Sequence, residues 1–197
     1  KGLLRREAGG YSAHAFVRQD ALARLRAAGE EPEAYGRLLA YASDLVARAE
    51  AHLRTADEAR WLDRLEAEHP SIGAALEWAL ERGEAEAAAR LCAVLRWLWY
   101  IRGYIGEGRC WMERATALAR GHVERGMLAR LLQGAGVLAD EQGDYGAAAA
   151  HYAEGLAIYR AGGDRNGVRI ILNSLGALEN ARGRYAEARA CFEESLG

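Results

Sequence analysis

A repeat with a period of about 40 residues in the second half of the chain limits the fold more than any other feature. Gly103, Gly143 and Gly183 recur at this constant interval. Five further columns move with these glycines and keep a similar character in all three copies: Leu98, Leu138 and Leu178; Ile105, Tyr145 and Tyr185; Gly108, Ala148 and Ala188; Met112, Tyr152 and Phe192; Thr116, Leu156 and Leu196. A period of this length predicts a solenoid of stacked structural repeats.

Each column has a structural role in a hairpin of two helices. The glycine ends the first helix in a left-handed conformation, and the second helix begins two residues later. The aromatic residue packs against the turn, the small residue lets the helices approach closely, and the large apolar residue fills the seam between them. Because such a hairpin cannot bury its apolar face alone, stacked copies are expected to share one core.

Copies two and three resemble the tetratricopeptide (TPR) repeat. They present that family's series of large, small, glycine, aromatic, small, aromatic and large residues: Leu132, Gly136, Gly143, Tyr145, Ala148, Tyr152 and Leu156, then Leu172, Gly176, Gly183, Tyr185, Ala188, Phe192 and Leu196. The first copy departs from the series at Arg96 and Cys92, where the family has a small and a large residue. The resemblance implies an all-α, right-handed superhelix of antiparallel hairpins over residues 84–197, with the last repeat incomplete.

Composition favours helices along the rest of the chain as well. Ala, Leu, Arg and Glu are abundant, and the chain has two prolines. No stretch shows the apolar–polar alternation of a strand, so no strand is expected. Ser12 is expected to cap a helix that Gly29 closes, and a second helix is expected over about 33–53.

Two further helices are expected before the repeats. Thr55 and Glu58 form a capping box that begins a third helix, which Pro70 ends. Ser71 caps a fourth helix, which stops at Gly83. With the helices of the repeats, this makes about ten helices in all, joined by short connections.

Residues 1–83 carry a second resemblance. Residues 16–30 (FVRQDALARLRAAGE) are similar to the helix that follows the winged-helix module of bacterial STAND-type regulators, LuxR- or AfsR-like proteins that join an ATPase switch to a helical sensor. Residues 61–69 (WLDRLEAEH) and 75–83 (ALEWALERG) resemble their linker, and residues 108–115 (GRCWMERA) resemble the second helix of their first repeat. This likeness implies a helical linker domain over residues 1–83, after a winged-helix and ATPase module, with sensor repeats behind it.

Charge and cysteine content narrow the function classes. The formal net charge is -2, which gives no field that would draw the whole chain to nucleic acid. Residues 1–28 hold six basic and two acidic side chains. These side chains form either a surface that contacts DNA or an acidic protein domain, or a solvent-exposed helix face. Cys92, Cys110 and Cys191 have no C-x-x-C spacing, which predicts reduced thiols in a cytoplasmic protein.

No motif in the sequence predicts catalysis, a cofactor or a metal site. No phosphate-binding G-x-x-x-x-G-K-[ST] occurs, and residues 134–139 (GAGVLA) fit a loose dinucleotide motif only inside an expected helix. The five histidines are scattered, and no nucleophile lies beside a base in a strained turn. No run of about 18 apolar residues predicts a membrane span. Since the chain opens without Met and stops within a repeat, we expect it to be a piece of a larger protein.

The run of residues 97–104 (WLWYIRGY) is the most unusual local feature. Consecutive aromatic residues cannot all face one side of a helix, so Trp97 and Tyr100 point away from the core if Leu98 and Trp99 face it. Two interpretations remain open. The exposed rings either anchor a protein partner or pack against the preceding helical layer around Trp78.

The repeat register identifies the side chains that line the inner, concave face. The first helix of each hairpin lines this face in a TPR-like solenoid, and the polar and aromatic residues in that register are Arg90, Trp97, Tyr100, Arg130, Gln133, Asp140, Asn173 and Asn180. Amides and guanidinium groups in a row are able to hydrogen-bond a peptide backbone or a carboxylate, with the two rings as an apolar wall. The alternative is a hydrated groove without a ligand.

These features together predict a non-catalytic segment that binds a protein, a peptide or a small-molecule effector in a STAND-type transcriptional regulator. Direct nucleic-acid binding and membrane attachment are not expected. A stand-alone TPR adaptor and the regulatory arm of a kinase or nucleotide cyclase are the alternatives. Because Phe192 and Leu196 lack a following layer, a homodimer through the C-terminal end is also expected.

Overall fold

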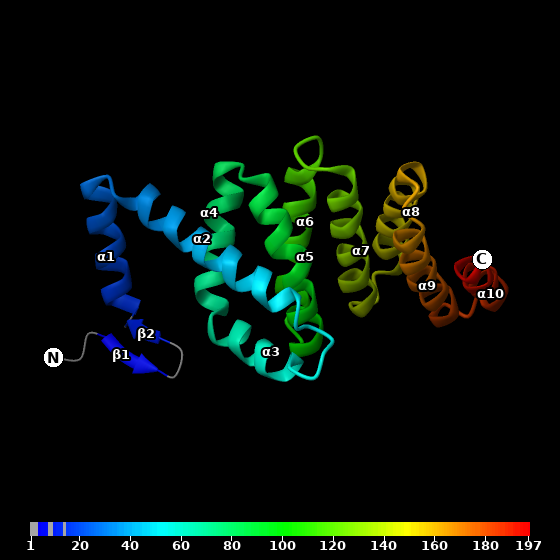
Figure 1. Ribbon diagram of the computed structural model, residues 1–197, viewed down its shortest axis with the longest axis horizontal. Coiled ribbons are helices and arrows are strands. Elements are labelled where there is room, and N and C mark those ends of the chain that lie inside the picture. The colour runs from blue at the N-terminus through cyan, green and yellow to red at the C-terminus, as the bar shows by residue number, and fades with distance from the viewer. Residues whose placement is uncertain (1–3, 8–9, 14) are drawn as a thin grey trace. The chain divides into compact units, whose positions relative to one another are not determined.

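The computed structural model describes residues 4–7, 10–13 and 15–197, with side chains from Gln19 onward. The chain divides into two compact units, residues 1–82 and 83–197. Within the described residues there are ten helices and one two-stranded hairpin (Figure 1). The all-helical, solenoid-like fold is therefore confirmed. The right-handed sense of the coil, and the assignment of residues 1–83 as a linker domain, stay predictions.

The first unit begins with a short antiparallel hairpin, followed by four helices. Their bounds are β1 Leu4–Glu7, β2 Gly10–Ala13, α1 Ala15–Ala28, α2 Glu31–Glu50, α3 Glu58–Ala67 and α4 His69–Arg82. The hairpin differs from the sequence prediction, because Ser12 lies in β2 and pairs with Arg5 across the strands, whereas the first helix begins at Ala15. Strands of four residues are too short to show an alternating pattern, which is why the sequence gives no sign of them.

The start of α3 also differs in detail from the expected capping box. The Glu58 carboxylate accepts a hydrogen bond from the Arg54 amide at 2.6 Å, one residue earlier than the Thr55 amide of the predicted box. Thr55 Oγ1 accepts from the Asp57 amide at 3.2 Å. Pro70 lies in the first turn of α4, where its missing N–H costs no helical hydrogen bond. The unit buries apolar residues from α2, α3 and α4: Ala42, Leu45, Val46, Ala49, Leu62, Leu65, Ile72, Ala75, Leu76 and Ala79.

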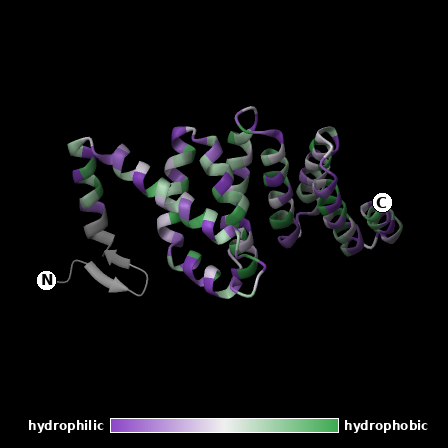
Figure 2. Ribbon diagram, viewed as in Figure 1, coloured by the Kyte–Doolittle hydropathy of each residue, from purple (hydrophilic) through white to green (hydrophobic). Residues whose placement is uncertain are grey.

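The second unit consists of three consecutive helical hairpins. Their helices are α5 Ala85–Arg102 and α6 Ile105–Ala119, α7 Arg125–Glu141 and α8 Tyr145–Gly162, and α9 Arg165–Ala181 and α10 Tyr185–Leu196. Gly103, Gly143 and Gly183 have φ angles of 79°, 74° and 74°, in the left-handed region that favours glycine. The second helix of each hairpin begins two residues after this glycine, as the repeat predicts. Hydrophobic and hydrophilic residues are interspersed along these helices (Figure 2).

Close approach inside the hairpins depends on glycine–aromatic contacts. A Cβ atom built on Gly136 of α7 would lie 2.4 Å from Tyr152 Cε1 of α8, and one built on Gly176 would lie 2.6 Å from Phe192 Cε1. The two contacts are equivalent, because the second lies one repeat period beyond the first in both partners. The aromatic ring therefore occupies the volume that a side chain on the first helix would otherwise fill.

The first hairpin packs through different residues, as its departures at Arg96 and Cys92 suggest. Here the large ring is Trp99 on the first helix, and a Cβ on Gly108 of the second helix would lie 2.7 Å from it. Arg96 is accommodated by the next hairpin, because a Cβ on Gly134 of α7 would lie 2.6 Å from Arg96 Cδ. In the first hairpin the bulky ring of the seam thus comes from the first helix and the glycine from the second. In the later two hairpins the glycine comes from the first helix and the ring from the second.

Candidate partner-binding face

The odd-numbered helices of the second unit form a continuous inner layer. Helix α5 packs against α7, and α7 packs against α9. Among the described helices, no comparable backbone packing joins α6 to α8 or α8 to α10. Because the odd-numbered helices lie closer together than the even-numbered ones, the layer curves toward the odd-numbered side. The concave face is therefore made by α5, α7 and α9, which run parallel to one another.

Helix α7 shows most clearly which side chains this face leaves accessible. From Ala129 to Ala139 every residue is buried except Arg130, Gln133 and Val137, which are half-buried. Asp140 continues the same stripe and is also half-buried. The spacing of these four residues is that of one helical face. Neighbouring helices thus cover α7 on all sides but one, and the open side carries the predicted residues.

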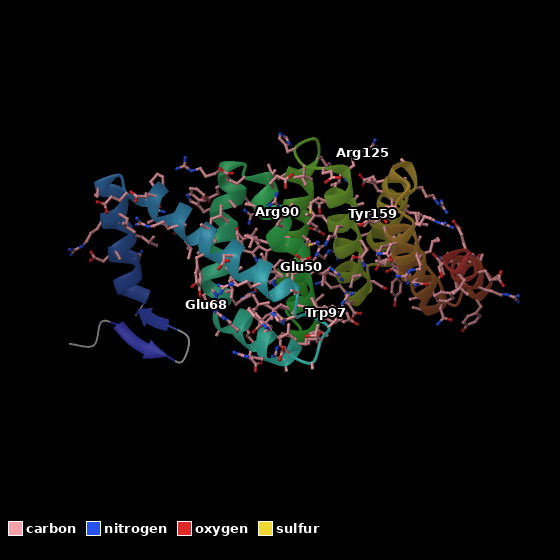
Figure 3. The ribbon with its side chains drawn as sticks, viewed as in Figure 1. Glu50, Glu68, Arg90, Trp97, Arg125 and Tyr159 are labelled. Atoms are coloured by element: carbon pink, nitrogen blue, oxygen red, sulfur yellow. The ribbon has the colours of Figure 1, made fainter. Side chains whose placement is uncertain are left out.

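Helix α5 contributes an arginine and an aromatic pair to the same face. Arg90 is exposed, and its guanidinium lies 3.0 Å from the Glu86 carboxylate one turn earlier. The rings of Trp97 and Tyr100 stack with centroids 5.8 Å apart and planes 26° apart. Figure 3 labels Arg90 and Trp97, which lie two turns apart on this helix. Trp97 is half-buried and Tyr100 is exposed.

Both interpretations of the aromatic run remain in place. Trp99 is buried in the hairpin seam, as expected. Trp78, the predicted centre of the alternative packing, stacks on Tyr35 within the first unit, with ring centroids 6.2 Å apart. Arg82 lies over the Trp78 ring at 5.7 Å from its centroid. The stacked pair Trp97 and Tyr100 stays a predicted partner anchor.

Helix α9 supplies the two amides of the predicted site. Asn173 and Asn180 are both accessible, Asn173 exposed and Asn180 at the exposed end of the helix, and they lie two helical turns apart. The Asn173 amide is 2.9 Å from the Ser195 hydroxyl of α10, which holds the amide in place. The structure thus puts all eight predicted residues on the inner helices at accessible positions. Whether they bind a ligand stays a prediction.

The face has different chemistry at its two edges. Arg90 and Arg130 occupy equivalent positions near the beginnings of parallel helices, so their guanidinium groups lie along one edge. Asp140 and Asn180 lie near the helix ends, along the other edge. Burial raises the pKa of the Asp140 carboxyl, and the nearby Glu141 carboxylate raises it further. A cationic edge opposite an acidic one favours a ligand that has its own direction, such as a peptide.

Ion pairs on the outer layer are a repeated feature that the sequence reasoning missed. The Arg120 guanidinium pairs with the Glu154 carboxylate, and the Arg160 guanidinium pairs with the Glu194 carboxylate. Both partners of the second pair lie one repeat period beyond those of the first. These long side chains bridge the wider spacing between even-numbered helices. The repeat register was a sufficient signal to find them.

A denser polar cluster joins α6 to the turn of the next hairpin. Arg109 lies 2.8 Å from the Glu113 carboxylate, 2.6 Å from the Asp144 carboxylate and 3.0 Å from the Gln142 amide oxygen. Asp144 also accepts from the Ala147 amide at 3.1 Å. This backbone hydrogen bond, and then the Arg109 guanidinium, lower the pKa of the Asp144 carboxyl. The arrangement caps α8 and ties two hairpins together, which is a structural role.

Two surface cavities of the second unit lie away from the predicted face. One of about 400 Å³ is formed by the end of α8, the start of α9 and the end of α10, and is lined by Tyr159, Arg160, Gly163, Arg165, Val168, Arg169, Glu194, Ser195, Leu196 and Gly197. The other, of about 250 Å³, is formed by the start of α7, the end of α8 and the α8–α9 turn (Arg125 and Tyr159 are labelled in Figure 3). Neither cavity is lined by any of the eight predicted residues.

The glycines of the loose dinucleotide motif have a packing role. Gly134 and Gly136 lie inside α7, where Met112 and Tyr152 fill the space beside them. Among the described residues, no group of three or more His, Cys, Asp or Glu side chains has the arrangement of a metal site. Over the same residues, no helix is long and apolar enough to cross a membrane.

Comparison with known proteins supports the helical fold and does not assign a family. No known protein family matches the sequence, and no curated protein matches it. The structure is similar to the crystal structure of BtubC (BKLC) from P. vanneervenii, with a TM-score of 0.57 and 16% sequence identity. The match covers 83% of this chain and 72% of that chain. At this identity, the likeness shows a shared helical, repeat-like fold.

Proposed function

We propose that this chain is a non-catalytic binding segment whose ligand lies along the concave face of α5, α7 and α9. The observation that carries the proposal is the accessible stripe on α7, a helix whose other sides are buried. The accessible row on α7 forms the middle of the face, and the accessible residues Arg90 on α5 and Asn173 on α9 continue it on either side. An extended peptide fits such a surface, because its backbone offers hydrogen-bonding groups at regular intervals.

The chemistry of the face supports a peptide with an acidic group near one end. Arg90 and Arg130 would attract a carboxylate along one edge, and the two asparagines of α9 would pair with backbone groups. The stacked rings of Trp97 and Tyr100 would cover an apolar side chain, since aromatic residues often dominate binding energy. By the same proposal, the chain has no catalytic site, cofactor or metal of its own.

A direct test compares a double asparagine variant on the concave face with a control variant on the outer layer. Peptides are selected from a displayed library on the wild-type chain, and their affinities are measured by fluorescence anisotropy. We expect Asn173→Ala with Asn180→Ala to weaken binding about 5- to 150-fold, because two hydrogen bonds contribute about 1–3 kcal/mol together. Glu187→Ala is the control, since Glu187 is exposed on α10, outside the concave face.

The control also separates binding from folding. Melting temperatures of all variants are expected to stay within a few degrees of the wild type, because the substituted side chains are accessible to solvent. Equal affinities for the double variant and the wild type would refute the proposed face. A loss of affinity of the same size in Glu187→Ala would also refute it.

We further propose that the binding segment belongs to a STAND-type transcriptional regulator, on the strength of the likeness in residues 16–30, 61–69 and 75–83. In that setting, ligand occupancy would change how the repeats act on an ATPase switch, which requires two states that the ligand distinguishes. Sequencing the gene around this segment tests the setting. A phosphate-binding loop and a winged helix upstream would support a regulator, whereas a start codon just before Lys1 would favour an adaptor.

A further inference from the structure

Equivalent positions near the ends of the three inner helices carry side chains that attract a positive charge. Helices α5, α7 and α9 begin 40 residues apart and run parallel, so Tyr100, Asp140 and Asn180 are equivalent. These three residues form a row across the concave face, because α7 packs against both α5 and α9. An aromatic ring, a carboxylate and an amide oxygen all interact favourably with a cation. The row at the helix beginnings has the opposite character, since it holds Arg90 and Arg130.

Asp140 is the member of this row whose charge is not compensated within the chain. Its carboxylate is half-buried, and among the described residues no cation or hydrogen-bond donor pairs with it. Burial raises the pKa of this carboxyl, the Glu141 carboxylate raises it further, and no positive charge of the described residues opposes the change. The Tyr152 hydroxyl, on which the Asp140 charge acts, hydrogen-bonds with the Ser174 hydroxyl instead. The Asp140 carboxylate has therefore lost part of its hydration without gaining a partner, which costs free energy.

The other half-buried carboxylates of the second unit have partners, which makes Asp140 an exception. Each of them pairs with an arginine: Asp144 with Arg109, Glu154 with Arg120, and Glu179 with Arg184. Hydrogen bonding lowers the pKa of these three carboxyls, whereas the pKa of the Asp140 carboxyl is raised. The second unit thus supplies an arginine wherever a carboxylate is half-buried, except on the concave face. A ligand cation would fill the missing place.

Tyr100 and Val137 give the surroundings of Asp140 an apolar part. The Tyr100 ring is 37% exposed, and Trp97 stacks against it with ring centroids 5.8 Å apart, which restricts its movement. Val137 lies about one turn before Asp140 on α7 and is half-buried. Lysine and arginine side chains combine a charged end with an apolar stem, and both interact favourably with the faces of aromatic rings. The row therefore suits a basic side chain better than a small hydrated cation.

We propose a specific ligand feature, which rests on the peptide-binding function above: the bound peptide carries a lysine or arginine whose charged end pairs with Asp140 and whose stem lies along the Tyr100 ring. The Asn180 amide oxygen accepts a further hydrogen bond from the same charged end. Arg130 and Asp140 are ten residues apart on α7, a rise of about 15 Å. An extended peptide covers this distance with about four or five residues. The basic residue is therefore expected about four or five positions from the acidic residue that Arg130 attracts.

Peptide selection tests this feature without assuming a ligand. A displayed library of random peptides is selected separately on the whole wild-type chain and on Asp140→Asn. The wild type is expected to enrich lysine or arginine at about four or five positions from an acidic residue. Asp140→Asn is expected to keep the acidic residue and lose the basic one. Its melting temperature is expected to match or exceed that of the wild type, because the substitution removes an uncompensated charge.

A double-mutant cycle then measures the contact directly by fluorescence anisotropy. One selected peptide is compared with a neutral version, in which norleucine replaces lysine or citrulline replaces arginine. Asp140→Asn is expected to weaken binding of the basic peptide about 10- to 150-fold, the range of a charge-assisted hydrogen bond, and binding of the neutral peptide less than about threefold. Glu187→Gln is the matched control, because it removes the same charge from an exposed position of α10 and should change neither affinity.

Equal affinities of Asp140→Asn and the wild type for the basic peptide would overturn the contact, and so would an equal loss for the basic and neutral peptides. A loss of the same size in Glu187→Gln would show a general effect of charge and would also overturn it. In each of these cases, peptides that still lose affinity in the double asparagine variant would leave the peptide-binding function standing. A selection that returns no peptide, or only peptides indifferent to Asn173 and Asn180, would remove the binding face and this contact with it.

Discussion

Gly136 offers the sharpest test of how the hairpins pack. A Cβ at this position would lie 2.4 Å from Tyr152 Cε1, 2.7 Å from Cδ1 and 3.0 Å from Cζ. The Tyr152 ring is 1% exposed, so it has no open space into which to turn. Gly136→Ala therefore forces the ring or the helix backbone to shift. Such overpacking costs about 1–3 kcal/mol, and the better helix propensity of alanine offsets about 1 kcal/mol.

The expected result is a loss of up to about 2 kcal/mol in the free energy of unfolding, measured by urea denaturation with circular dichroism at 222 nm. For a chain of this size, each kcal/mol corresponds to a fall of about 2–4 °C in melting temperature. Gly146→Ala is the matched control. Gly146 also lies in a helix, and an added Cβ meets only Asp144 Oδ1, at 3.8 Å. This variant is expected to be unchanged or slightly more stable.

A double-mutant cycle identifies Tyr152 as the cause. Tyr152→Leu leaves a cavity beside Gly136, so adding Gly136→Ala to it is expected to cost less than in the wild type or to stabilise the chain. A coupling free energy of about 1 kcal/mol or more between the two sites is the expected result. If Gly136→Ala were as stable as Gly146→Ala, or if the two sites showed no coupling, the packing argument would be wrong.

Three other predictions concern the outer layer and the turns. Hydrogen bonding to Arg120 lowers the pKa of the Glu154 carboxyl below its usual 4.5. The ion pair therefore stabilises the folded chain fully above pH 4.5, and this stabilisation is lost as the pH falls through the lowered pKa of the folded state. Arg120→Ala is expected to cost less than about 1 kcal/mol at pH 7, because the pair is partly exposed, and urea denaturation should show no difference from wild type near pH 2. Burial lowers the pKa of His151 below its usual 6.5, even though the Glu113 and Glu154 carboxylates oppose the change. As the pH drops below 6.5, the imidazole of the unfolded chain is protonated before that of the folded chain, so the free energy of unfolding falls. His151→Gln is expected to show a smaller loss than wild type between pH 7 and pH 5 in melting experiments. Gly103→Ala places a Cβ in a left-handed turn where no atom lies within 4 Å. Calorimetry should therefore show only the backbone cost of about 1 kcal/mol. A larger loss of stability would indicate a contact that the structure lacks.

The repeat register predicted the second unit well because its signal is redundant. The turn glycines, the helix starts and the seam at Gly136 and Gly176 all follow from one repeat period. The accessible stripe on α7 lies where the register placed it. Residues that repeat at a fixed spacing share an environment, so each copy supports the interpretation of the others.

The features that the sequence did not predict are local or involve non-repeated contacts. The β1–β2 hairpin is too short for a periodic pattern, and the capping of α3 depends on which backbone amide the Glu58 carboxylate reaches. Arg96 fits because Gly134 of the next hairpin leaves room for its side chain. The two residues do not occupy equivalent positions in the repeat, so comparing the repeats does not predict their contact. The ion pairs of the outer layer do follow the repeat period, but charged residues are common enough that their spacing draws no attention.

The reversed seam of the first hairpin makes the repeats unequal as building units. In the later hairpins the bulky ring comes from the second helix, at Tyr152 and Phe192, whereas in the first it comes from Trp99 on the first helix. Exchanging α8 for α10 would keep a ring opposite a glycine. Exchanging α6 for α8 would set Tyr152 against Arg96 and Ala148 against Trp99, so two bulky groups would compete for one space. Duplication or shuffling of single hairpins during evolution is therefore expected to be tolerated only beyond α6, which gives the array a fixed first member.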